Sequence, residues 1–401
     1  MKKQPIKSFL REVTLIPLLR TAAGIRPRTS SRKPETPLKL VLLISRTHDI
    51  DLLFDIYRQA AGRPEIEAVF WARRKVLEEF PATRKLLHKR GLAIEFSVGH
   101  GNLRTAISRL AEVDALINTV ESSIARHKVA SRLVRIARVA GVRTYTLQHA
   151  FENVGLTYVD PDFDKGIDFS ADRVLTWGNP ENLTGNPTPE TVAKCVGVGC
   201  PKFNLEPAIN TDAGAQSANR RKTLIAVFEG LHAKQFNLGY MRRFFNDLQE
   251  TANHFQEYTF MLKPHPSIIK RAPEHATFLK SLHNVKVLDP AIPANNLDWP
   301  TPKLLTTAQA VITTPSTIAL DAALNNTPVA VTRYHEDSPN YRHYHPLPLL
   351  DKSEDWQQFL EGAVQHPLPL HDRIKAFRQR VIIPGNAAGR ILDLIIRDCN
   401  K

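Results

Sequence analysis

Cysteines and long apolar runs are both scarce in this sequence. Among 401 residues there are three cysteines, and Cys195, Cys200 and Cys399 form neither a paired framework nor a C-x-x-C metal-binding motif. This scarcity favours the reducing cytosol over an oxidising compartment. The longest uncharged apolar run near the start covers residues 13–19, far short of the roughly 20 residues that cross a bilayer. Charges interrupt any secretory signal there, so we predict a cytoplasmic protein without a membrane span.

Acidic residues are outnumbered by basic ones, chiefly near the start of the chain. The net charge is +14, and residues 1–39 contain ten Lys or Arg against two Glu, which accounts for more than half of the excess. One interpretation places this basic leader on the anionic inner face of the cell membrane, where each basic residue contributes about 1 kcal/mol. The other interpretation is a frayed, proline-rich tail. Either way, the body of the protein is only mildly basic.

The length and patterning indicate two α/β domains. A chain of 401 residues is too long for one ordinary core, and its composition of 42% hydrophobic and 23% charged residues is that of a soluble globular protein. From residue 38 onward, short β-branched runs alternate with amphipathic stretches. This alternation is typical of a parallel sheet with helices on both faces.

Two series of strands are predicted, separated by a stretch at 210–221 that is rich in Asn, Ala, Gly, Ser and Thr. The predicted strands are 38–45, 66–71, 92–96, 114–118, 142–148 and 173–177, then 223–228, 258–263, 285–288, 310–313 and 328–331. Gly62, Gly91 and Gly141 stand where left-handed C-caps are expected. The fold class is therefore α/β, with two doubly wound, Rossmann-like domains facing each other across a cleft.

These boundaries divide the chain into five expected segments. They are a basic leader (1–37), an N-terminal Rossmann-like domain (38–195), a linker (196–221), a C-terminal Rossmann-like domain (222–384) and a closing C-terminal helix (385–401). Ligands of doubly wound sheets bind beyond the carboxyl ends of the strands. The loops that follow the strands are therefore where binding and catalytic residues are expected.

The segment 310–331 combines a buried strand, a polar turn and a helix start. Backbone N–H groups at a helix start, together with the hydroxyls of Ser316 and Thr317 after Thr314, form a cradle for phosphate. One turn further on, Asp321 is placed to accept hydrogen bonds from a ribose or sugar hydroxyl. The alternative is an ordinary β-α-β unit, capped at Ser316 and carrying a surface Asp.

Another strand, at 258–263, ends in two cationic side chains. Prolines on both sides of His265 fix its backbone and present its ring from the carboxyl end of the strand. Lys263 adds a second positive charge two residues earlier. This pair favours binding of an anionic leaving group over a structural role.

The strand at 142–148 leads into a third candidate pair. His149 carries an imidazole, which titrates near working pH and is suited to take a proton from an acceptor hydroxyl. Glu152 is close enough in sequence to orient that ring or to act as the base itself. A packed histidine at a strand end is an equally good reading of the same residues.

Taken in order, several short motifs resemble those of GT-B glycosyltransferases. The motifs are residues 172–178, 196–204, Lys-Pro-His-Pro at 263–266, Thr-Pro-Ser-Thr at 314–317 with Asp321 and Pro328, and residues 385–390. Within this group the chain looks most like the capsule polysaccharide and CDP-glycerol glycerophosphotransferase enzymes. The resemblance implies an acceptor domain first and a nucleotide-donor domain second.

The resemblance also implies roles for individual residues. His149 matches the family's base, His265 matches a ligand of the donor phosphate, and this chain has Ala150 where the family usually has Gly. A related resemblance is to bacterial sialyltransferases, whose acidic-acidic-Gly motif is half matched by residues 228–230. It makes Glu229 a further candidate base.

Metal sites are not expected, although two patterns suggest them. Asp160, Asp162 and Asp164 spell D-x-D twice, but no suitable apolar strand precedes them. Three histidines at 335, 343 and 345 lie in a proline-rich loop, and GT-B enzymes generally need no metal. A helix predicted at 124–143 carries a basic stripe that faces either solvent or a polyanion.

The sequence therefore predicts a metal-independent GT-B glycosyltransferase without a cofactor. It would move a sugar or sugar-like unit from a nucleotide-activated donor to a cell-surface polysaccharide or a lipid-linked acceptor. CDP-glycerol-type glycerophosphotransfer and sialyl transfer are variants of this hypothesis, and a non-hydrolysing UDP-sugar 2-epimerase is the nearest enzymatic alternative. A non-enzymatic nucleic-acid-binding protein is the fourth hypothesis, but basic residues in such proteins cluster with exposed aromatics. We therefore expect no nucleic-acid partner.

Overall fold

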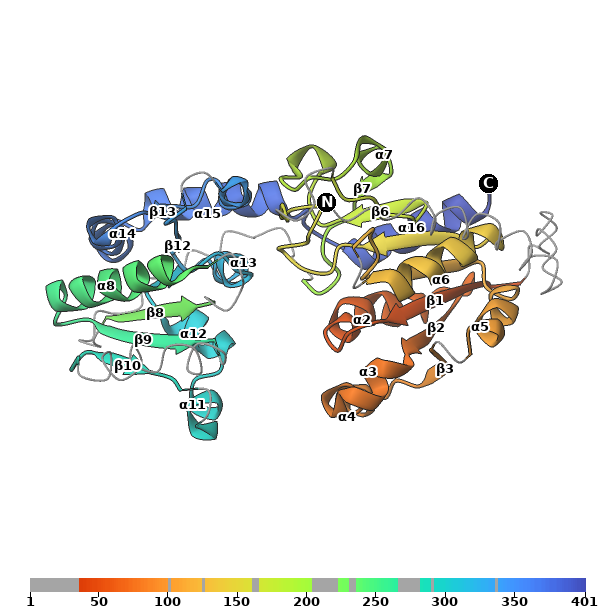
Figure 1. Ribbon diagram of the computed structural model, residues 1–401, viewed down its shortest axis with the longest axis horizontal. Helices are drawn as coiled ribbons and strands as arrows, with labels where there is room; N and C mark the ends of the chain where they lie inside the picture. Colours follow the sequence, from red (N-terminus) through yellow and green to blue (C-terminus); the bar gives the residue numbers. More distant parts are fainter. Residues whose placement is uncertain are drawn as a thin grey trace, which may run out of the picture.

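The computed structural model describes residues 36–99, 102–124, 127–160, 166–203, 223–230, 236–265, 282–289, 292–335 and 338–401. In these ranges the chain forms two parallel β-sheets, one after the other, with helices packed on them (Figure 1). The α/β class and the two Rossmann-like halves are thus confirmed. The basic leader up to residue 35 and the Asn- and Ser-rich stretch at 210–221 lie outside the described residues.

The first sheet has seven strands in the order β3-β2-β1-β4-β5-β6-β7. They are β1 (Leu38–Ile44), β2 (Ile66–Arg73), β3 (Ile94–Val98), β4 (Ala115–Asn118), β5 (Arg143–Leu147), β6 (Arg173–Thr176) and β7 (Cys195–Gly197). All neighbouring strands pair in parallel. The strand order reverses between β1 and β4, and such a reversal opens a crevice at the carboxyl ends.

Helices cover both faces of this sheet. They are α2 (Asp49–Ala60), α3 (Arg74–Glu79), α4 (Pro81–Lys89), α5 (Leu103–Leu110), α6 (Lys128–Val139) and α7 (Pro189–Val192), with a 3-10 turn, η3 (Pro180–Asn182). Leu40 and Leu42 of β1 belong to one buried cluster, whereas Val41 and Leu43 belong to another on the opposite face. Because both faces are covered, β1 is apolar at five consecutive positions, 40–44, rather than alternating.

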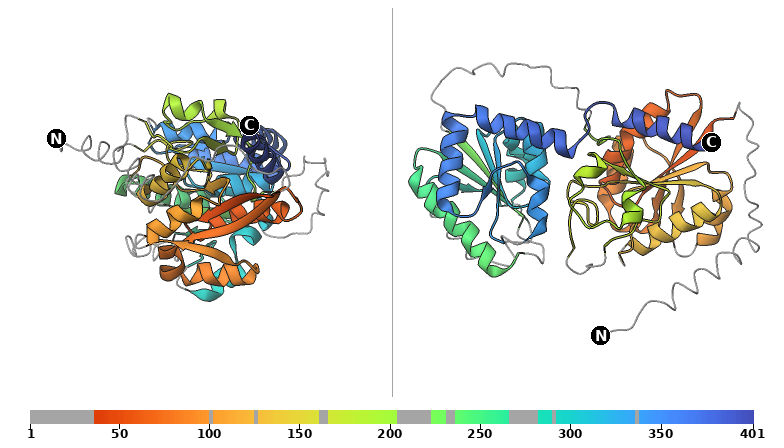
Figure 2. Two further views of the ribbon diagram at one scale, coloured as in Figure 1. Left: turned by 90° about the vertical axis from the view of Figure 1, so that its right-hand side faces the viewer. Right: turned by 90° about the horizontal axis from the view of Figure 1, so that it is seen from above.

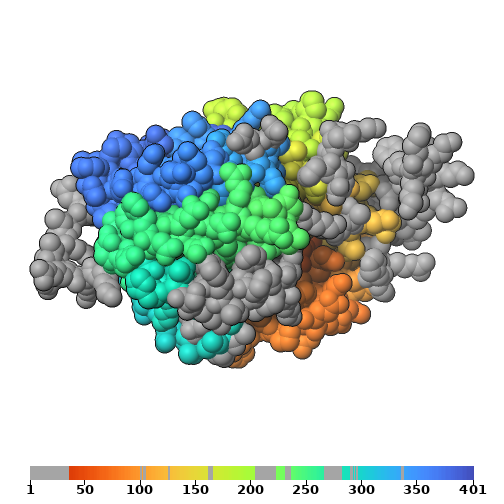
Figure 3. Space-filling model, turned by 60° about the vertical axis from the view of Figure 1, so that its left-hand side comes forward, coloured from red at the N-terminus to blue at the C-terminus, as the bar shows by residue number. Residues whose placement is uncertain are grey.

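The second sheet has six strands in the order β10-β9-β8-β11-β12-β13. They are β8 (Leu224–Glu229), β9 (Thr259–Pro264), β10 (Val285–Val287), β11 (Ala310–Thr313), β12 (Val329–Thr332) and β13 (Leu349–Leu350). Its helices are α8 (Leu238–His254), α11 (Pro293–Asp298), α12 (Thr301–Thr307), α13 (Ile318–Leu324), α14 (Ser353–Gln365), α15 (Leu368–Val381) and the 3-10 turn η4 (Pro339–Tyr344). On its outer face α8 (green) lies beside α14 (blue), as Figure 3 shows.

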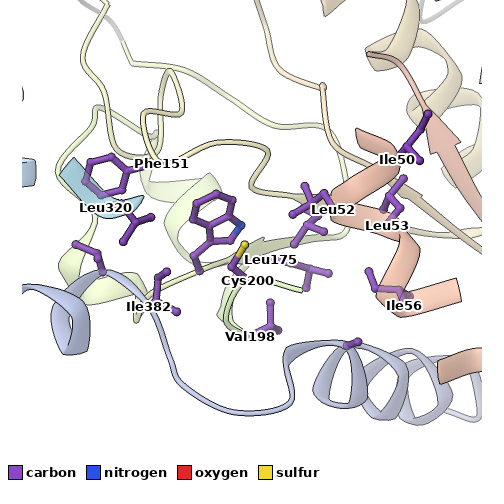
Figure 4. Packing of buried hydrophobic residues seen from close by; sticks show 14 of the residues in the cluster. Ile50, Leu52, Leu53, Ile56, Phe151, Leu175, Val198, Cys200, Leu320 and Ile382 are labelled. Carbon is purple, nitrogen blue, oxygen red and sulfur yellow. The ribbon is translucent and has the colours of Figure 1, made fainter. Parts of the chain in front are cut away.

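The end of the chain returns to the first half. Helix α15 packs against α13 of the second half, whereas the last helix, α16 (Ala387–Cys399), packs against α2 of the first (Figure 2). Phe151 of the first half, Leu320 of the second and Ile382 between α15 and α16 share one buried cluster (Figure 4). The two halves are therefore joined by packing as well as by the chain.

Some local predictions were wrong in detail. Strands β7 and β13 were not predicted, because runs of three and two residues carry too little pattern to be seen. β7 also extends across the expected boundary at residue 195. Gly91 (φ 63°) and Gly141 (φ 85°) are left-handed as predicted, but Gly62 does not have a positive φ. None of the helices in the described ranges is long and apolar enough to span a bilayer.

Candidate functional site

The loops after β1, β4 and β5 bring several basic side chains together at one edge of the first sheet. The His48 and His149 rings lie with their centroids 6.1 Å apart. Arg46 Nη2 is 3.3 Å from His127 Nε2. These side chains come from three separate strand ends, so the cluster exists only in the folded protein.

His149 occupies a well-fixed turn directly after β5. The preceding Gln148 accepts a hydrogen bond from the Trp177 backbone at 2.9 Å and donates one to the Ala150 carbonyl at 2.9 Å. Asn326 is the single non-glycine residue with positive φ in the described ranges, so the turn after His149 needs no glycine at position 150. Ala150 thus fits where the resembled family has Gly.

The surroundings of His149 keep its imidazole neutral at pH 7. Burial lowers its pKa well below the usual value, and the neighbouring Arg46, His48 and His127 lower it further. A hydrogen bond to the backbone of Thr119 acts in the opposite direction. A neutral imidazole has one nitrogen that can accept a proton, which is what a general base requires.

Glu152, the other candidate base, contacts the second half of the protein. Its Oε1 accepts a hydrogen bond from the Tyr344 hydroxyl at 2.5 Å. The preceding Phe151 accepts one at its carbonyl from His343 Nε2 at 3.0 Å, and the two rings stack with centroids 3.9 Å apart. Burial raises the pKa of Glu152. The structure thus places Glu152 at the junction of the two halves.

In the second half, three strand ends meet at the carboxyl edge. The backbone N–H of His265 donates to the carbonyl of Glu229 at 2.9 Å and to its Oε2 at 3.1 Å. The Gly230 N–H donates to the Thr314 hydroxyl oxygen at 2.9 Å. The ends of β8, β9 and β11 are therefore held together, and the predicted residues Glu229, His265 and Thr314 share one edge.

The helix start after β11 differs slightly from the prediction. Helix α13 begins at Ile318, and Thr317 occupies the N-cap position without a side-chain capping bond. The Ser316 hydroxyl accepts a bond from the Ile318 N–H at 3.3 Å and lies 3.0 Å from the Thr313 hydroxyl. Both predicted hydroxyls thus lie at the helix start, but α13 has only seven residues, so its macrodipole is small.

Lys263 has a different neighbour from the other candidates. Its Nζ donates to the Trp299 carbonyl, 3.0 Å away, at the turn before α12. Burial lowers the pKa of this amine. The structure thus attaches Lys263 to the α11–α12 connection.

Lys202 is a residue that our sequence analysis did not single out. It follows β7 and is exposed. Burial lowers the pKa of His48 in the first half, and the positive charge of Lys202 adds to this effect. The same charge opposes the rise that burial causes in the pKa of Asp321 on α13. Lys202 therefore lies near both edges. Lys202 could have been noticed in the sequence, because it follows Pro201 within the segment 196–204 that resembles a GT-B motif.

The remaining histidine and aspartate patterns show no metal site in the described residues. No group of three or more His, Cys, Asp or Glu side chains is placed to hold a metal ion there. His343 is stacked on Phe151, and burial lowers its pKa to about 3. Residues 161–165, which include two of the three D-x-D aspartates, lie outside the described ranges.

Comparison with solved structures shows which fold this is. The chain is similar to the UDP-GlcNAc 2-epimerase of Neisseria meningitidis bound to UDP-GlcNAc, with a TM-score of 0.56, 11% identity, and coverage of 90% of this chain and 100% of that one. It is also similar to a glycosyltransferase from Rickettsia africae, with a TM-score of 0.53, 12% identity, and coverage of 91% and 99%. A variant of the wall teichoic acid polymerase TagF matches with a TM-score of 0.51, 13% identity, and coverage of 99% and 98%.

These likenesses extend over nearly the whole of each chain and show the GT-B arrangement of two Rossmann-like domains. Identity of 11–13% establishes the fold alone. No family model matches the sequence. No curated protein matches it either.

Proposed function

We propose that this protein is a glycosyltransferase that moves a sugar or sugar-like unit from a nucleotide-activated donor to a polysaccharide or lipid-linked acceptor. The observation that carries the proposal is the environment of His149, a neutral imidazole at the carboxyl edge of the first sheet in a GT-B fold. Chemistry in doubly wound sheets takes place at that edge. The proposal requires no metal, so activity is expected to persist in EDTA.

In an inverting reaction, His149 would take the proton from the acceptor hydroxyl as its oxygen attacks the donor sugar. One ring nitrogen bonds to the Thr119 backbone, which leaves the other to accept that proton. His149 suits this role better than Glu152, whose carboxylate already accepts the Tyr344 hydroxyl. The base is therefore assigned to His149, and Glu152 to holding the two halves together.

The second half would hold the departing nucleotide. His265 would contact its phosphate, assisted by the hydroxyls of Thr314, Ser316 and Thr317 at the β11–α13 turn. Asp321 would accept a hydrogen bond from the ribose. Lys202 of the first half, whose charge lowers the pKa of Asp321, would add a cation to the nucleotide site. Developing negative charge on the leaving phosphate is the charge that such donors stabilise.

Glu229 is better explained as a support for His265 than as a base. It is 4% exposed, and both its carbonyl and its carboxylate accept the His265 backbone N–H. This contact fixes where β9 ends and hence where the His265 ring is presented. Sialyl transfer, which would use Glu229 as a base, is the less favoured variant.

A UDP-sugar 2-epimerase is the second candidate, favoured by the likeness to the Neisseria meningitidis epimerase. Epimerisation would need several carboxylates around the sugar ring. In the first half Asp49 accepts the Ser45 and Arg46 backbone N–H groups at 2.8 and 2.7 Å, and Glu121 accepts that of Ser170 at 2.9 Å. These bonds engage one oxygen of Asp49 and both oxygens of Glu121 within the fold, which favours transfer.

The test is product analysis with wild-type protein and His149→Ala. We expect wild-type protein to release nucleotide from a donor when an acceptor is present, and the variant to retain nucleotide binding but lose at least about 100-fold in turnover. A donor that is isomerised without any acceptor would identify an epimerase. Unchanged transfer by His149→Ala would refute the assignment of the base.

A further inference from the structure

A cavity of about 470 Å³ lies at the carboxyl ends of β1 and β2, entirely within the first half. Its size is in the range that takes a small-molecule ligand. The cavity shares Arg46 and His48 with the cluster around His149, and Arg73 at the end of β2 and Lys75 of α3 also line it. Three of these side chains are cations, whereas burial lowers the pKa of the His48 imidazole. The residues that line it, all in the described part of the chain, include no carboxylate.

This lining has the chemistry of a phosphate site. Two guanidinium groups can each present two parallel N–H donors to a phosphate, Lys75 adds a third positive charge, and a neutral His48 adds one N–H donor. A neutral sugar would gain little from so many cations. The charge of the cavity therefore points to an anionic ligand.

Arg46 is held in place at the edge of the cavity. Its backbone N–H donates to Asp49 Oδ2 at 2.7 Å. Because a guanidinium can only donate, His127 Nε2 must accept from Arg46 Nη2 at 3.3 Å. The proton of His127 then lies on Nδ1, which donates to the Ser122 hydroxyl 2.7 Å away. This chain of bonds orients the guanidinium before any ligand arrives.

The cavity also has an apolar wall, and one of its lining residues, His48, lies beside the proposed base. Phe80 is 49% exposed and lines the cavity together with Val76. The His48 ring, which lines the cavity, lies with its centroid 6.1 Å from that of His149. A ligand whose phosphate lies among the cations and whose polyol or sugar lies along His48 would present a hydroxyl toward His149.

We propose that this cavity binds a phosphate group of the acceptor and so places the acceptor hydroxyl near His149. The inference rests on the proposed function and narrows the acceptor to phosphate-bearing molecules. The cavity is built from first-half residues alone, whereas the donor is assigned to the second half. His127 is then a positioning residue that acts through Arg46.

The test is a titration of the full-length protein with glycerol 3-phosphate, followed by calorimetry. Arg73→Gln and Lys75→Gln are compared with Arg74→Gln, a matched control because Arg74 lines a different cavity beside α3. We expect Arg73→Gln to raise the dissociation constant about tenfold, as expected for the loss of a charge-assisted hydrogen bond. Arg74→Gln should leave it unchanged. Equal effects of Arg73→Gln and Arg74→Gln would overturn the proposal. It would also be overturned if the wild-type protein bound neither glycerol 3-phosphate nor a polyprenyl diphosphate.

Two further arms identify the ligand and separate this inference from the proposed function. The binding of a polyprenyl diphosphate in detergent micelles is compared with that of glycerol 3-phosphate. Tighter binding of either ligand that is lost in Arg73→Gln supports the proposal. The ligand that binds more tightly shows whether the acceptor is lipid-linked or soluble. Binding of CDP and UDP is measured in the same variants and should not change. If Arg73→Gln weakens nucleotide binding and spares glycerol 3-phosphate, the cavity serves the donor and the inference is wrong. If phosphate binding persists but no nucleotide binds, the proposed function alone fails.

Discussion

The Tyr344 hydroxyl lies 2.5 Å from the Glu152 carboxylate and donates to it across the junction between the two halves. Glu152 follows β5 of the first sheet, whereas Tyr344 ends the turn that follows β12 of the second. Beside this pair, the His343 ring stacks on Phe151 and donates from Nε2 to the backbone carbonyl of Phe151. The junction therefore fixes how the two carboxyl edges sit against each other.

This pair predicts a specific dependence of stability on pH. Burial raises the pKa of Glu152 above its ordinary value, so the folded protein binds a proton there that the unfolded chain releases. The contribution of Glu152 to stability is then complete below the ordinary carboxyl pKa and falls as the pH rises through the folded value, by at most about 1.4 kcal/mol per pH unit.

Glu152→Gln should remove this dependence, because a neutral amide oxygen can still accept the Tyr344 hydroxyl. Chemical unfolding of both proteins between pH 4 and 8 measures it, and the free energies of unfolding should diverge toward the upper end, with the variant the more stable. Tyr344→Phe is the contrasting change, since it leaves a buried carboxylate without its donor and should cost about 1–3 kcal/mol. Parallel pH curves for wild-type protein and Glu152→Gln would mean that Glu152 is not coupled to folding in this way.

His265→Ala tests the proposed contact with the leaving phosphate. Loss of one electrostatic donor to a transition state typically lowers turnover about 100- to 1,000-fold, and we expect a loss of that order. The backbone N–H that bonds to Glu229 remains in the variant, so the melting temperature should change little. His366→Ala, at an exposed position after α14, is the matched control and should be silent. Full turnover in His265→Ala would remove this residue from the site.

Lys202→Gln tests whether a first-half cation contributes to nucleotide binding. Because Lys202 is exposed, its contribution is screened and should be about 1 kcal/mol, which is about fivefold in the dissociation constant of CDP or UDP. The effect should shrink as salt is raised. Lys85→Gln, an exposed lysine on α4, serves as the control. An effect of equal size in both variants would show only a change in net charge.

The sequence was sufficient to predict both sheets because their strands are buried on two faces. The predicted strands 38–45 and 223–228 contain the unbroken apolar runs 40–44 and 224–228, and β1 and β8 occupy nearly the predicted ranges. The short edge strands β7 and β13 lacked any such signal. The pattern of apolar residues reflects which faces of a segment are buried by neighbouring elements. It therefore identifies central strands and misses short edge strands.

The candidate site was predicted in part. The carboxyl ends of strands gave His149, His265 and Thr314, because a polar residue directly after a buried run stands out in the sequence. The contact of Glu152 with Tyr344 was not predictable, because the two residues lie 192 positions apart and are brought together by the packing of two sheets. The cationic cavity was missed for the same reason, since Arg46 and Arg73 are separated by a whole β-α unit.

Calorimetric titration of the full-length protein with CMP, CDP, UDP and GDP tests directly whether the second half binds the donor nucleotide while the first half supplies the base. We expect at least one of these nucleotides to bind, His265→Ala to weaken this binding, and His149→Ala to leave it unchanged. If none of the four nucleotides binds to the wild-type protein, or if His149→Ala and His265→Ala weaken binding equally, the assignment of the base to the first half and of the nucleotide site to the second half is contradicted.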